Sequence, residues 1–193
     1  GEPALKLAKA KGCRVDGVTI SNKQHEEAVS RAESGGMADR VQFINGDATK
    51  VDCEDAIYDG GWFFESIFHM GHAKALKEAG RIMKPGAVLL VADFIVLHTT
   101  TEGFLKTARE EDRSHYIPKE EYYDLLDAAG FEFLEFLDVT KNVVPSMASK
   151  VREAFATRKD GIEQSTIDEV VARIERMSNN LGYLLVTARR VEK

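Results

Sequence analysis

The sequence Ala87-Val-Leu-Leu-Val-Ala-Asp93 is an uninterrupted apolar run that ends in a carboxylate. Runs of this length and composition are typical of a strand that is buried on both faces, as in the middle of a parallel sheet. A helical pattern over residues 72–84 precedes the run, and we expect Pro85-Gly86 to end that helix because proline cannot continue it. The run therefore predicts a central strand of an α/β sheet.

The same alternation of strand and helix extends from this run toward both ends of the chain. Ser21 is suited to cap one of the predicted helices, because its hydroxyl can accept a hydrogen bond from the first turn. The further strands are predicted over 14–20, 40–45, 58–64, 131–139 and 183–188, and the further helices over 4–11, 23–34, 119–129 and 145–180, the last with a break at Asp160-Gly161. Strands that alternate with helices predict a doubly wound α/β fold.

Composition narrows the classes of function. The 193 residues include 32 acidic and 26 basic side chains, for a net charge of −6. We expect no nucleic-acid partner, because phosphate binding needs a concentrated basic face. No apolar run approaches the roughly 20 residues of a membrane span. Cys13 and Cys53 have no metal-ligand spacing, so we expect no metal site, and two free cysteines are typical of a cytoplasmic protein.

Two segments interrupt the alternation. Residues 95–118 follow a predicted strand, are mostly polar and contain two histidines. An insertion of this length at the carboxyl end of a strand either closes over a ligand or acceptor as a lid or forms a surface excursion, and the sequence leaves both interpretations open. The helical stretch 145–180 is a second insertion, between the last two strands.

Four polar side chains, Asp47, Glu65, His69 and Asp93, come at or just after the ends of predicted strands. In open α/β sheets, ligands bind outside the carboxyl ends of the strands, so we expect these side chains to share one rim of the sheet. Three carboxylates and an imidazole suit a site that handles hydroxyls, amines or a cation.

Several segments in order along the chain carry a family resemblance. They are Gly1-Glu2-Pro3-Ala4, Val15-Asp-Gly-Val-Thr-Ile-Ser-Asn-Lys-Gln24, Arg40-Val-Gln-Phe-Ile-Asn-Gly-Asp-Ala48, Glu65-Ser-Ile-Phe-His-Met70, Arg81-Ile-Met-Lys-Pro-Gly86, Val91-Ala-Asp-Phe94, and Asp138-Val-Thr140 with Pro145-Ser146. Together they resemble the class I S-adenosylmethionine (SAM)-dependent methyltransferases, and within these the branch of rebeccamycin-type sugar O-methyltransferases. The resemblance covers nearly the whole chain.

The resemblance implies a Rossmann-like, mostly parallel sheet with an antiparallel last strand, in a single domain over 1–193. It also implies that the first strand and the glycine-rich cofactor loop of the fold precede residue 1, so that the domain is N-terminally incomplete. We then expect an unpaired edge on each strand that would flank the first one. We also expect weak SAM binding by this chain alone, since the loop supplies close backbone contacts.

The resemblance also assigns the contacts with the cofactor. Gly1 matches the last glycine of the loop, where a side chain would collide with SAM. Gln24 is the expected ribose partner, and Asp47 would accept a hydrogen bond from the adenine amino group. The residues that the resemblance implies for cofactor binding are Gly1, Thr19, Ile20, Gln24, Asp47, Ala48 and Glu65.

His69 and Asp93 match positions near the acceptor in the sugar O-methyltransferases. SAM carries an electrophilic methyl group, so the protein must align a hydroxyl and remove one proton, a task suited to histidine. Asp93 would hold the tautomer of the imidazole or bind a sugar hydroxyl. Where those enzymes have two adjacent histidines, this chain has Phe68-His69, so one candidate base is missing.

Each of these residues also has a simpler structural interpretation. Asp47 and Asp93 could cap turns, Glu65 could be an acid at a helix N-terminus, His69 a packed histidine, and Gln24 an exposed helix residue.

The expected function is methyl transfer from SAM to a hydroxyl of a small molecule, with a sugar of a natural product as one acceptor and S-adenosylhomocysteine (SAH) as the product. Two alternatives stay open: N- or C-methylation of a small metabolite, and a non-catalytic binding module with the same fold. The sequence leaves the oligomeric state open, a homodimer included.

Overall fold

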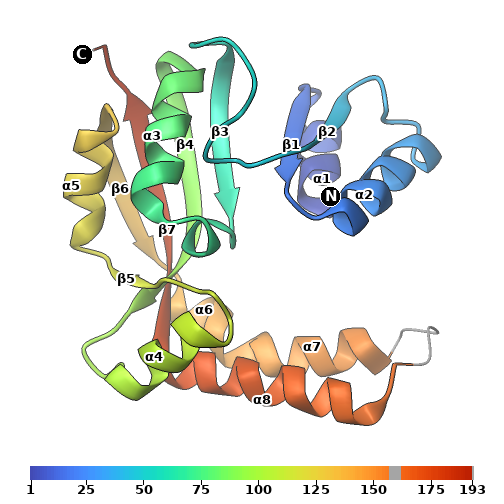
Figure 1. Cartoon of the computed structure of the whole chain (residues 1–193), viewed down its shortest axis with the longest axis vertical. Helices are drawn as coiled ribbons and strands as arrows, with labels where there is room; N and C mark the ends of the chain where they lie inside the picture. The colour runs from blue at the N-terminus through green and yellow to red at the C-terminus, as the bar shows by residue number, and fades with distance from the viewer. Residues whose placement is uncertain (157–161, 193) are drawn as a thin grey trace.

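The computed structural model describes residues 1–156 and 162–192, and the predicted break at Asp160-Gly161 lies outside them. The chain begins with a small sheet in which β1 (Val15–Thr19) pairs in parallel with β2 (Val41–Asn45). Helices α1 (Glu2–Lys11) and α2 (Asn22–Ser34) pack against these strands (Figure 1). The Ser21 hydroxyl accepts a hydrogen bond from the Gln24 N–H at 3.3 Å, so the predicted cap of α2 is confirmed.

The larger sheet has the strand order β3-β4-β7-β6. Its strands are β3 (Tyr58–Phe64), β4 (Met83–Val96), β7 (Leu181–Arg190) and β6 (Phe131–Asp138), and the short β5 (Ile117–Pro118) pairs with the end of β4. β3 and β4 are parallel, whereas β7 is antiparallel to both β4 and β6. The predicted α/β Rossmann-like fold with an antiparallel last strand is confirmed.

β1 and β3 each have a single strand neighbour within the described residues, β2 and β4 respectively. Each therefore presents one unpaired edge, as predicted for two strands of this sheet. The Tyr58 hydroxyl, at the start of β3, donates a hydrogen bond of 2.9 Å to Asp16 Oδ2 in β1, which links the two sheets at the amino ends of these strands.

Helices α3 (His72–Ile82) and α5 (Glu121–Ala128) cover one face of the larger sheet. The core between them contains Leu76, Leu89 and Leu126, all at most 1% exposed. The prediction that Pro85-Gly86 would end the preceding helix is wrong, because α3 already ends at Ile82 and both residues lie within β4. Proline is tolerated there because the pairing of β4 with β3 is interrupted between Met83 and Val88.

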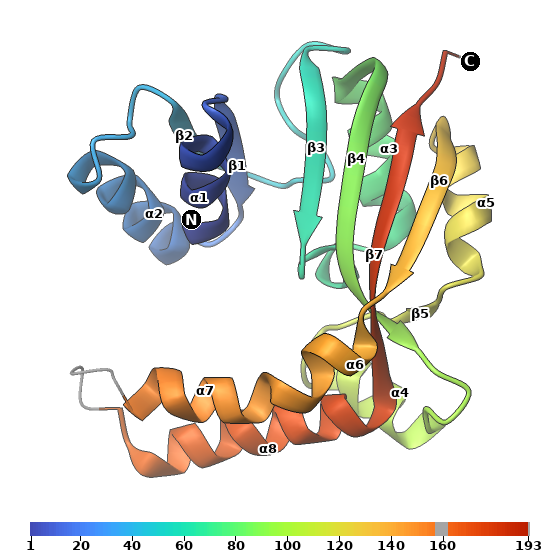
Figure 2. The ribbon, with the colours of Figure 1, turned by 180° about the vertical axis from the view of Figure 1, so that it is seen from behind.

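The prediction that the run 87–92 is buried on both faces is also wrong. Val88 and Leu90 are 39% and 48% exposed, because α3 and α5 lie behind the sheet and leave the other face open (Figure 2). Trp62 of β3, the register partner of Leu90, and Leu185 of β7 are exposed as well. From Ala87 to Leu90 the strand therefore alternates between a covered and an uncovered face, whereas all residues from Val91 to Ile95 are buried.

A helical layer follows the carboxyl ends of β3 and β4. It consists of the 3₁₀ turn η1 (Ile67–His69), α4 (Glu102–Glu110), α6 (Thr140–Val143), η2 (Val144–Ser146), α7 (Met147–Ala156) and α8 (Gln164–Asn180). Helices α7 and α8 lie side by side below the sheets, with α4 against α8 (Figure 1). Among the described residues no helix is long and apolar enough to cross a lipid bilayer.

Candidate functional site

The carboxyl ends of β1 and β2 present a connected group of polar side chains. The Thr19 hydroxyl donates to Gln24 Oε1 at 2.9 Å and accepts from the Ser21 N–H at 3.2 Å. The Gly46 N–H donates to the Thr19 carbonyl at 2.9 Å, which joins the end of β1 to the turn after β2. Gln24, the predicted ribose partner, is therefore in direct contact with Thr19, another residue that the resemblance implies for cofactor binding.

Ile20 directly follows this group and is 77% exposed. An isoleucine that projects from a strand end into solvent offers an apolar surface beside hydroxyl and amide groups. This combination fits the flat apolar face and the polar edge of a nucleoside, which is the chemistry expected for the adenosine half of SAM.

Asp47 lies in the turn after β2, with Ala48 next to it. Its Oδ1 accepts hydrogen bonds from both the N–H and the hydroxyl of Thr49, each at 2.8 Å. The Thr49 N–H lowers the pKa of Asp47, and the Thr49 hydroxyl adds to the effect, so the carboxylate is charged at neutral pH. The turn-cap interpretation is therefore correct for Oδ1, and both bonds leave Oδ2 to face solvent on this exposed residue.

Gly1 is the N-cap residue of α1. A Cβ at this position would lie 2.7 Å from Ala28 Cβ and 3.0 Å from the ring of Phe43, closer than packed atoms approach. The described structure therefore requires glycine at this position because of α2 and β2. The resemblance implies that a side chain at Gly1 would also collide with SAM, and that collision stays a prediction.

Glu65 directly follows β3 and has a φ of +48°, a left-handed conformation that is uncommon outside glycine. Two contacts hold it: its N–H donates to the Ala92 carbonyl at 2.9 Å, and its Oε1 accepts from the Tyr183 hydroxyl at 2.7 Å. Burial and the Glu65 carboxylate raise the pKa of Tyr183 above its ordinary range, so this hydroxyl stays a donor. Glu65 is exposed yet fixed at the end of the strand.

His69 ends η1 and is exposed. Its Nδ1 lies 3.4 Å from the Arg113 carbonyl and 3.3 Å from the Ser114 hydroxyl. The Ser114 hydroxyl is also positioned to donate to the Asp112 carbonyl, at 3.2 Å. A carbonyl only accepts, so this geometry favours a proton on Nδ1 and a free lone pair on Nε2.

The segment after α4 is fixed on η1 by its backbone as well. The His115 N–H donates to the Phe68 carbonyl at 2.8 Å, and the Ser114 N–H donates to the Ala108 carbonyl at 2.9 Å. Ser114 is only 2% exposed. This part of the insertion 95–118 therefore lies against His69 and orients its ring.

Asp93 does not contact His69, contrary to one of its predicted roles. It is fully buried, and its Oδ2 accepts hydrogen bonds from His72 Nε2 at 2.8 Å and from the Tyr122 hydroxyl at 2.5 Å. Its Oδ1 accepts from the Phe94 N–H at 2.9 Å. The physical reason is its position on β4, where its side chain points to the face covered by α3 and α5. No sugar hydroxyl can reach a carboxylate buried in this way.

Four partners of the site were not singled out from the sequence: Tyr183, Ser114, His72 and Tyr122. One signal could have found the last two. A carboxylate at the end of a buried apolar run needs hydrogen-bond donors, and His72 and Tyr122 are donors in the two helical patterns predicted to flank that run. No comparable signal marks Ser114 or Tyr183, because both contacts depend on tertiary packing.

The predicted site residues form two groups on separate sheets. Thr19, Gln24 and Asp47 belong to the small sheet, and Glu65 and His69 to the larger one. Within the described parts of the chain, no hydrogen bond joins the two groups. A ligand with a polar group at each end could contact both.

Comparison with known proteins identifies the family. Residues 1–91 match the model of a family described as a methyltransferase domain. The chain is 31% identical to 27-O-demethylrifamycin SV methyltransferase of Amycolatopsis mediterranei, over 98% of this chain and 74% of that protein. It is also 31% identical to the O-methyltransferase resE of Aspergillus sclerotiorum, over 99% of this chain and 72% of that protein.

A solved structure gives the same fold at lower identity. The structure of geranyl diphosphate C-methyltransferase from Streptomyces coelicolor A3(2), with Mg²⁺, geranyl diphosphate and SAH, superimposes with a TM-score of 0.77 at 19% identity. The alignment covers 99% of this chain and 68% of that one. The fold, the family match and the two relatives agree, and the chain belongs to the class I SAM-dependent methyltransferases.

Proposed function

We propose that the protein transfers the methyl group of SAM to a hydroxyl of a small molecule, with His69 as the general base. The observation that carries the proposal is the orientation of His69, whose Nδ1 is engaged by Arg113 and Ser114 while the exposed ring leaves Nε2 available. The names of the two relatives, both O-methyltransferases, support oxygen as the methylated atom.

When bound, SAM supplies an electrophilic methyl group on a sulfonium centre. It would give up this group to the acceptor oxygen and leave as SAH, and Nε2 of His69 would take the proton of the acceptor hydroxyl. Arg113 and Ser114 keep the proton on Nδ1, so that Nε2 is the basic nitrogen of the neutral ring. The reaction needs no further group in this scheme.

The cofactor contacts remain those that the resemblance assigns. We infer that Thr19 and Gln24 bind the ribose hydroxyls, and that Ile20 packs on the adenine. Asp47 would accept from the adenine amino group through Oδ2, with the Ala48 N–H beside it. Gly1 and Glu65 would border the methionine half, where Tyr183 holds the Glu65 carboxylate in place.

Asp93 receives a positioning role in this proposal. It fixes the end of β4 through Phe94 and holds His72 at the start of α3, directly after the segment that carries His69. It acts on the shape of the rim and touches neither acceptor nor cofactor.

One experiment tests the proposed function. The purified protein is incubated with SAM carrying a ¹³C-labelled methyl group and a panel of small molecules that offer a hydroxyl, an amine or an activated carbon. SAH formation reports turnover, and the chemical shift of the transferred methyl distinguishes O-, N- and C-methyl products. We expect O-methyl products. Turnover restricted to amines or carbon acceptors would overturn the proposal.

C-methylation is the second candidate, and one observation favours it. Trp62 and Phe64 are 41% and 46% exposed, their rings lie edge to face at 5.3 Å, and Phe64 directly precedes Glu65. Aromatic faces next to a carboxylate can stabilise a carbocation. A sugar hydroxyl as the acceptor rests on the resemblance alone and is tested by sugars in the same panel.

A further inference from the structure

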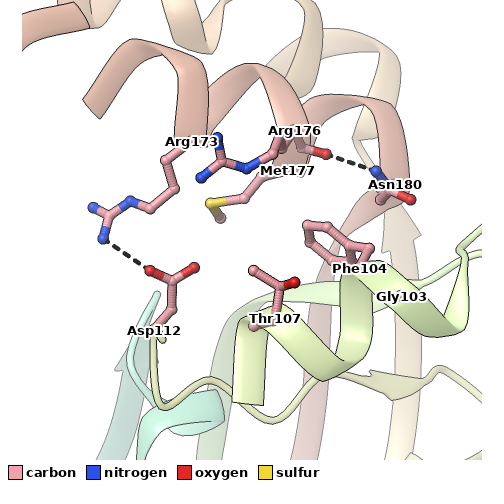
Figure 3. A pocket seen from close by; sticks show the side chains of 9 residues that line it. Gly103, Phe104, Thr107, Asp112, Arg173, Arg176, Met177 and Asn180 are labelled. Atoms are coloured by element: carbon pink, nitrogen blue, oxygen red, sulfur yellow. Dashed lines mark hydrogen bonds and ion pairs between the residues drawn. The ribbon is translucent and has the colours of Figure 1, made fainter. Parts of the chain in front are cut away.

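A pocket of about 280 Å³ lies between α4 and α8, beside the segment that holds His69 (Figure 3). Its lining combines apolar, polar and charged side chains: Gly103, Phe104, Thr107, Ala108, Asp112, Arg173, Arg176, Met177 and Asn180. One water molecule occupies roughly 30 Å³ in the liquid, so the pocket has room for a ligand of roughly ten non-hydrogen atoms.

Helical spacing explains why α8 lines the pocket with these residues. Arg173, Arg176, Met177 and Asn180 follow the i, i+3, i+4, i+7 pattern of one helix face. The acidic neighbour Glu175 lies on another face, where its Oε1 binds Arg152 of α7 at 3.2 Å. Although the chain is acidic overall, the face of α8 that meets α4 is therefore basic.

The pocket has an excess of positive charge. Arg173 Nη1 lies 3.3 Å from Asp112 Oδ1, so this pair is balanced. The guanidinium group of Arg176 has no hydrogen-bond or ion-pair partner within residues 1–156 and 162–192. Figure 3 shows Arg176 and Met177 projecting from α8 on the side that faces α4. Arg176 is thus a cation with its donors available at the edge of the pocket.

The rest of the lining selects the kind of anion. Phe104, Met177 and the buried Ala108 form an apolar wall, and the Thr107 hydroxyl adds a hydrogen-bonding group, whereas the Asn180 amide already donates to the Arg176 carbonyl at 2.9 Å. Guanidinium groups bind carboxylates in a planar, two-bond geometry. A small molecule with an apolar body and one carboxylate satisfies both parts of the lining, whereas a bare inorganic anion satisfies only the arginine.

The pocket and His69 are both lined or contacted by one segment of the chain. Asp112 lines the pocket, and Ser114, two residues later, contacts Nδ1 of His69. We propose that this pocket binds the carboxylate end of a small amphipathic acceptor, with Arg176 as the principal ligand and Arg173 as the second. The role as an acceptor subsite rests on the proposed methyl transfer, whereas carboxylate binding itself does not.

A matched pair of probes tests the binding. Phenylacetate and phenylacetamide have the same size and shape and differ in charge. The protein is labelled with [¹³C-methyl]methionine, which gives one signal for each of its five methionines, and the Met177 signal is assigned with Met177→Leu. We expect phenylacetate to shift the Met177 signal saturably, with a Kd of about millimolar for a ligand of this size, and phenylacetamide to bind at least about fivefold more weakly.

Arginine variants locate the carboxylate. Arg176→Gln should weaken phenylacetate binding by at least about fivefold, and the double variant Arg173→Gln/Arg176→Gln should abolish saturation. Arg152→Gln is the matched control, because Arg152 is an exposed arginine on α7 whose partner Glu175 lies outside the pocket, and it should leave the Kd unchanged.

Three results would overturn the proposal: equal affinity for the acid and the amide, an Arg176→Gln variant that binds like the wild type, or inorganic phosphate that shifts the Met177 signal at the same Kd as phenylacetate. The titration contains no SAM and measures no turnover. A failure here therefore leaves the proposed methyl transfer standing, and a failure of methyl transfer leaves the binding result standing.

Discussion

At the scale of single residues, His69 is the side chain on which the proposed chemistry depends. If Nε2 accepts the acceptor proton, His69→Ala removes the base and should lower kcat/KM by about 10²-fold. The comparison is His115→Gln, since His115 is an exposed histidine on the neighbouring segment whose hydrogen bond to η1 comes from its backbone N–H, which the substitution keeps. Initial rates of SAH formation measure both variants. A loss under threefold for His69→Ala would remove this residue from the mechanism.

Ser114 and the Arg113 carbonyl set the tautomer of His69 in this scheme. Ser114→Ala removes one of the two contacts to Nδ1, worth about 1 kcal/mol, so kcat should fall by roughly fivefold while KM changes little. The melting temperature separates positioning from folding. A positioning role lowers kcat and leaves the melting temperature at the wild-type value, whereas a purely structural role lowers both.

At the scale of secondary-structure elements, Asp93 joins three of them. It lies on β4 and accepts hydrogen bonds from His72 of α3 and Tyr122 of α5. Burial and the Asp93 charge raise the pKa of Tyr122 well above its ordinary value, so the hydroxyl remains a donor. Tyr122→Phe keeps the ring and removes that donor, and should lower the free energy of unfolding by about 1–3 kcal/mol.

The adjacent tyrosine provides the control for this prediction. Tyr123 is 48% exposed and packs its ring on Phe133 and Phe136, and its hydroxyl forms no hydrogen bond within the described chain. Tyr123→Phe should therefore change the free energy of unfolding by less than about 0.5 kcal/mol. Urea unfolding followed by circular dichroism measures both variants, and equal effects would show that the Asp93 bond contributes nothing specific.

Most helices and strands could be predicted from the sequence, because the patterns that indicate them are local. The strand over 58–64 and the start of a helix at His72 both occur as predicted, and the helix has an apolar stripe at helical spacing. The end of α3 was misplaced because the sequence cannot show that Pro85 falls in an interruption of strand pairing. The solvent exposure of Leu90 was not predicted, because the apolar character of a residue does not show whether a helix covers its face of the sheet.

The site was readable only in part. The position of Asp47 directly after a strand was predicted because topology brings strand ends to one edge, and the structure places it in the turn after β2, whereas its contact with the cofactor stays a prediction. The pairing of Asp93 with His72 depends on the direction in which one side chain leaves β4, and the support of His69 by Ser114 bridges 45 positions along the chain. Such contacts follow from packing, which no local pattern encodes.

At the scale of the whole molecule, Glu78 and Arg81 connect α3 with the segment that leads from the small sheet to the large one. Glu78 Oε1 accepts from the Val51 N–H at 2.7 Å, and Arg81 donates to the carbonyls of Val51 and Cys53, each at 2.8 Å. The hydrogen bonds from Arg81 lower the pKa of Glu78 below its ordinary value of 4.5. Glu78 is only 9% exposed and the Arg81 side chain is 31% exposed, so the connection is partly shielded from solvent.

The lowered pKa gives the connection a defined pH dependence. A carboxyl whose pKa is lower in the folded state adds stability that is fully present above 4.5 and is lost as the pH falls through the folded-state pKa. Glu78→Gln should therefore cost about 1–3 kcal/mol at pH 7, and its difference from the wild type should shrink below pH 4.5. Urea unfolding at several pH values measures this, and a difference independent of pH would contradict it. The exposed pair Lys84–Asp59 supplies the control, because Lys84→Met should have little effect.

The two groups of cofactor residues lie on different sheets, so SAM or SAH must bridge them if the proposed contacts are correct. Millimolar SAH should then slow amide exchange both at the end of β1 around Thr19 and at the end of β3 around Glu65. Asp47→Ala, on the small sheet, should reduce occupancy at a fixed SAH concentration and hence reduce protection at both places in the same proportion. Asp59→Asn, at the exposed amino end of β3 and so at the opposite end of the strand from Glu65, should reduce neither. A single bound ligand protects both places to the same extent, because its occupancy is the same for both. Two results would therefore show that the two groups do not share a ligand: protection on one sheet alone, or an Asp47→Ala variant that loses protection on the small sheet alone.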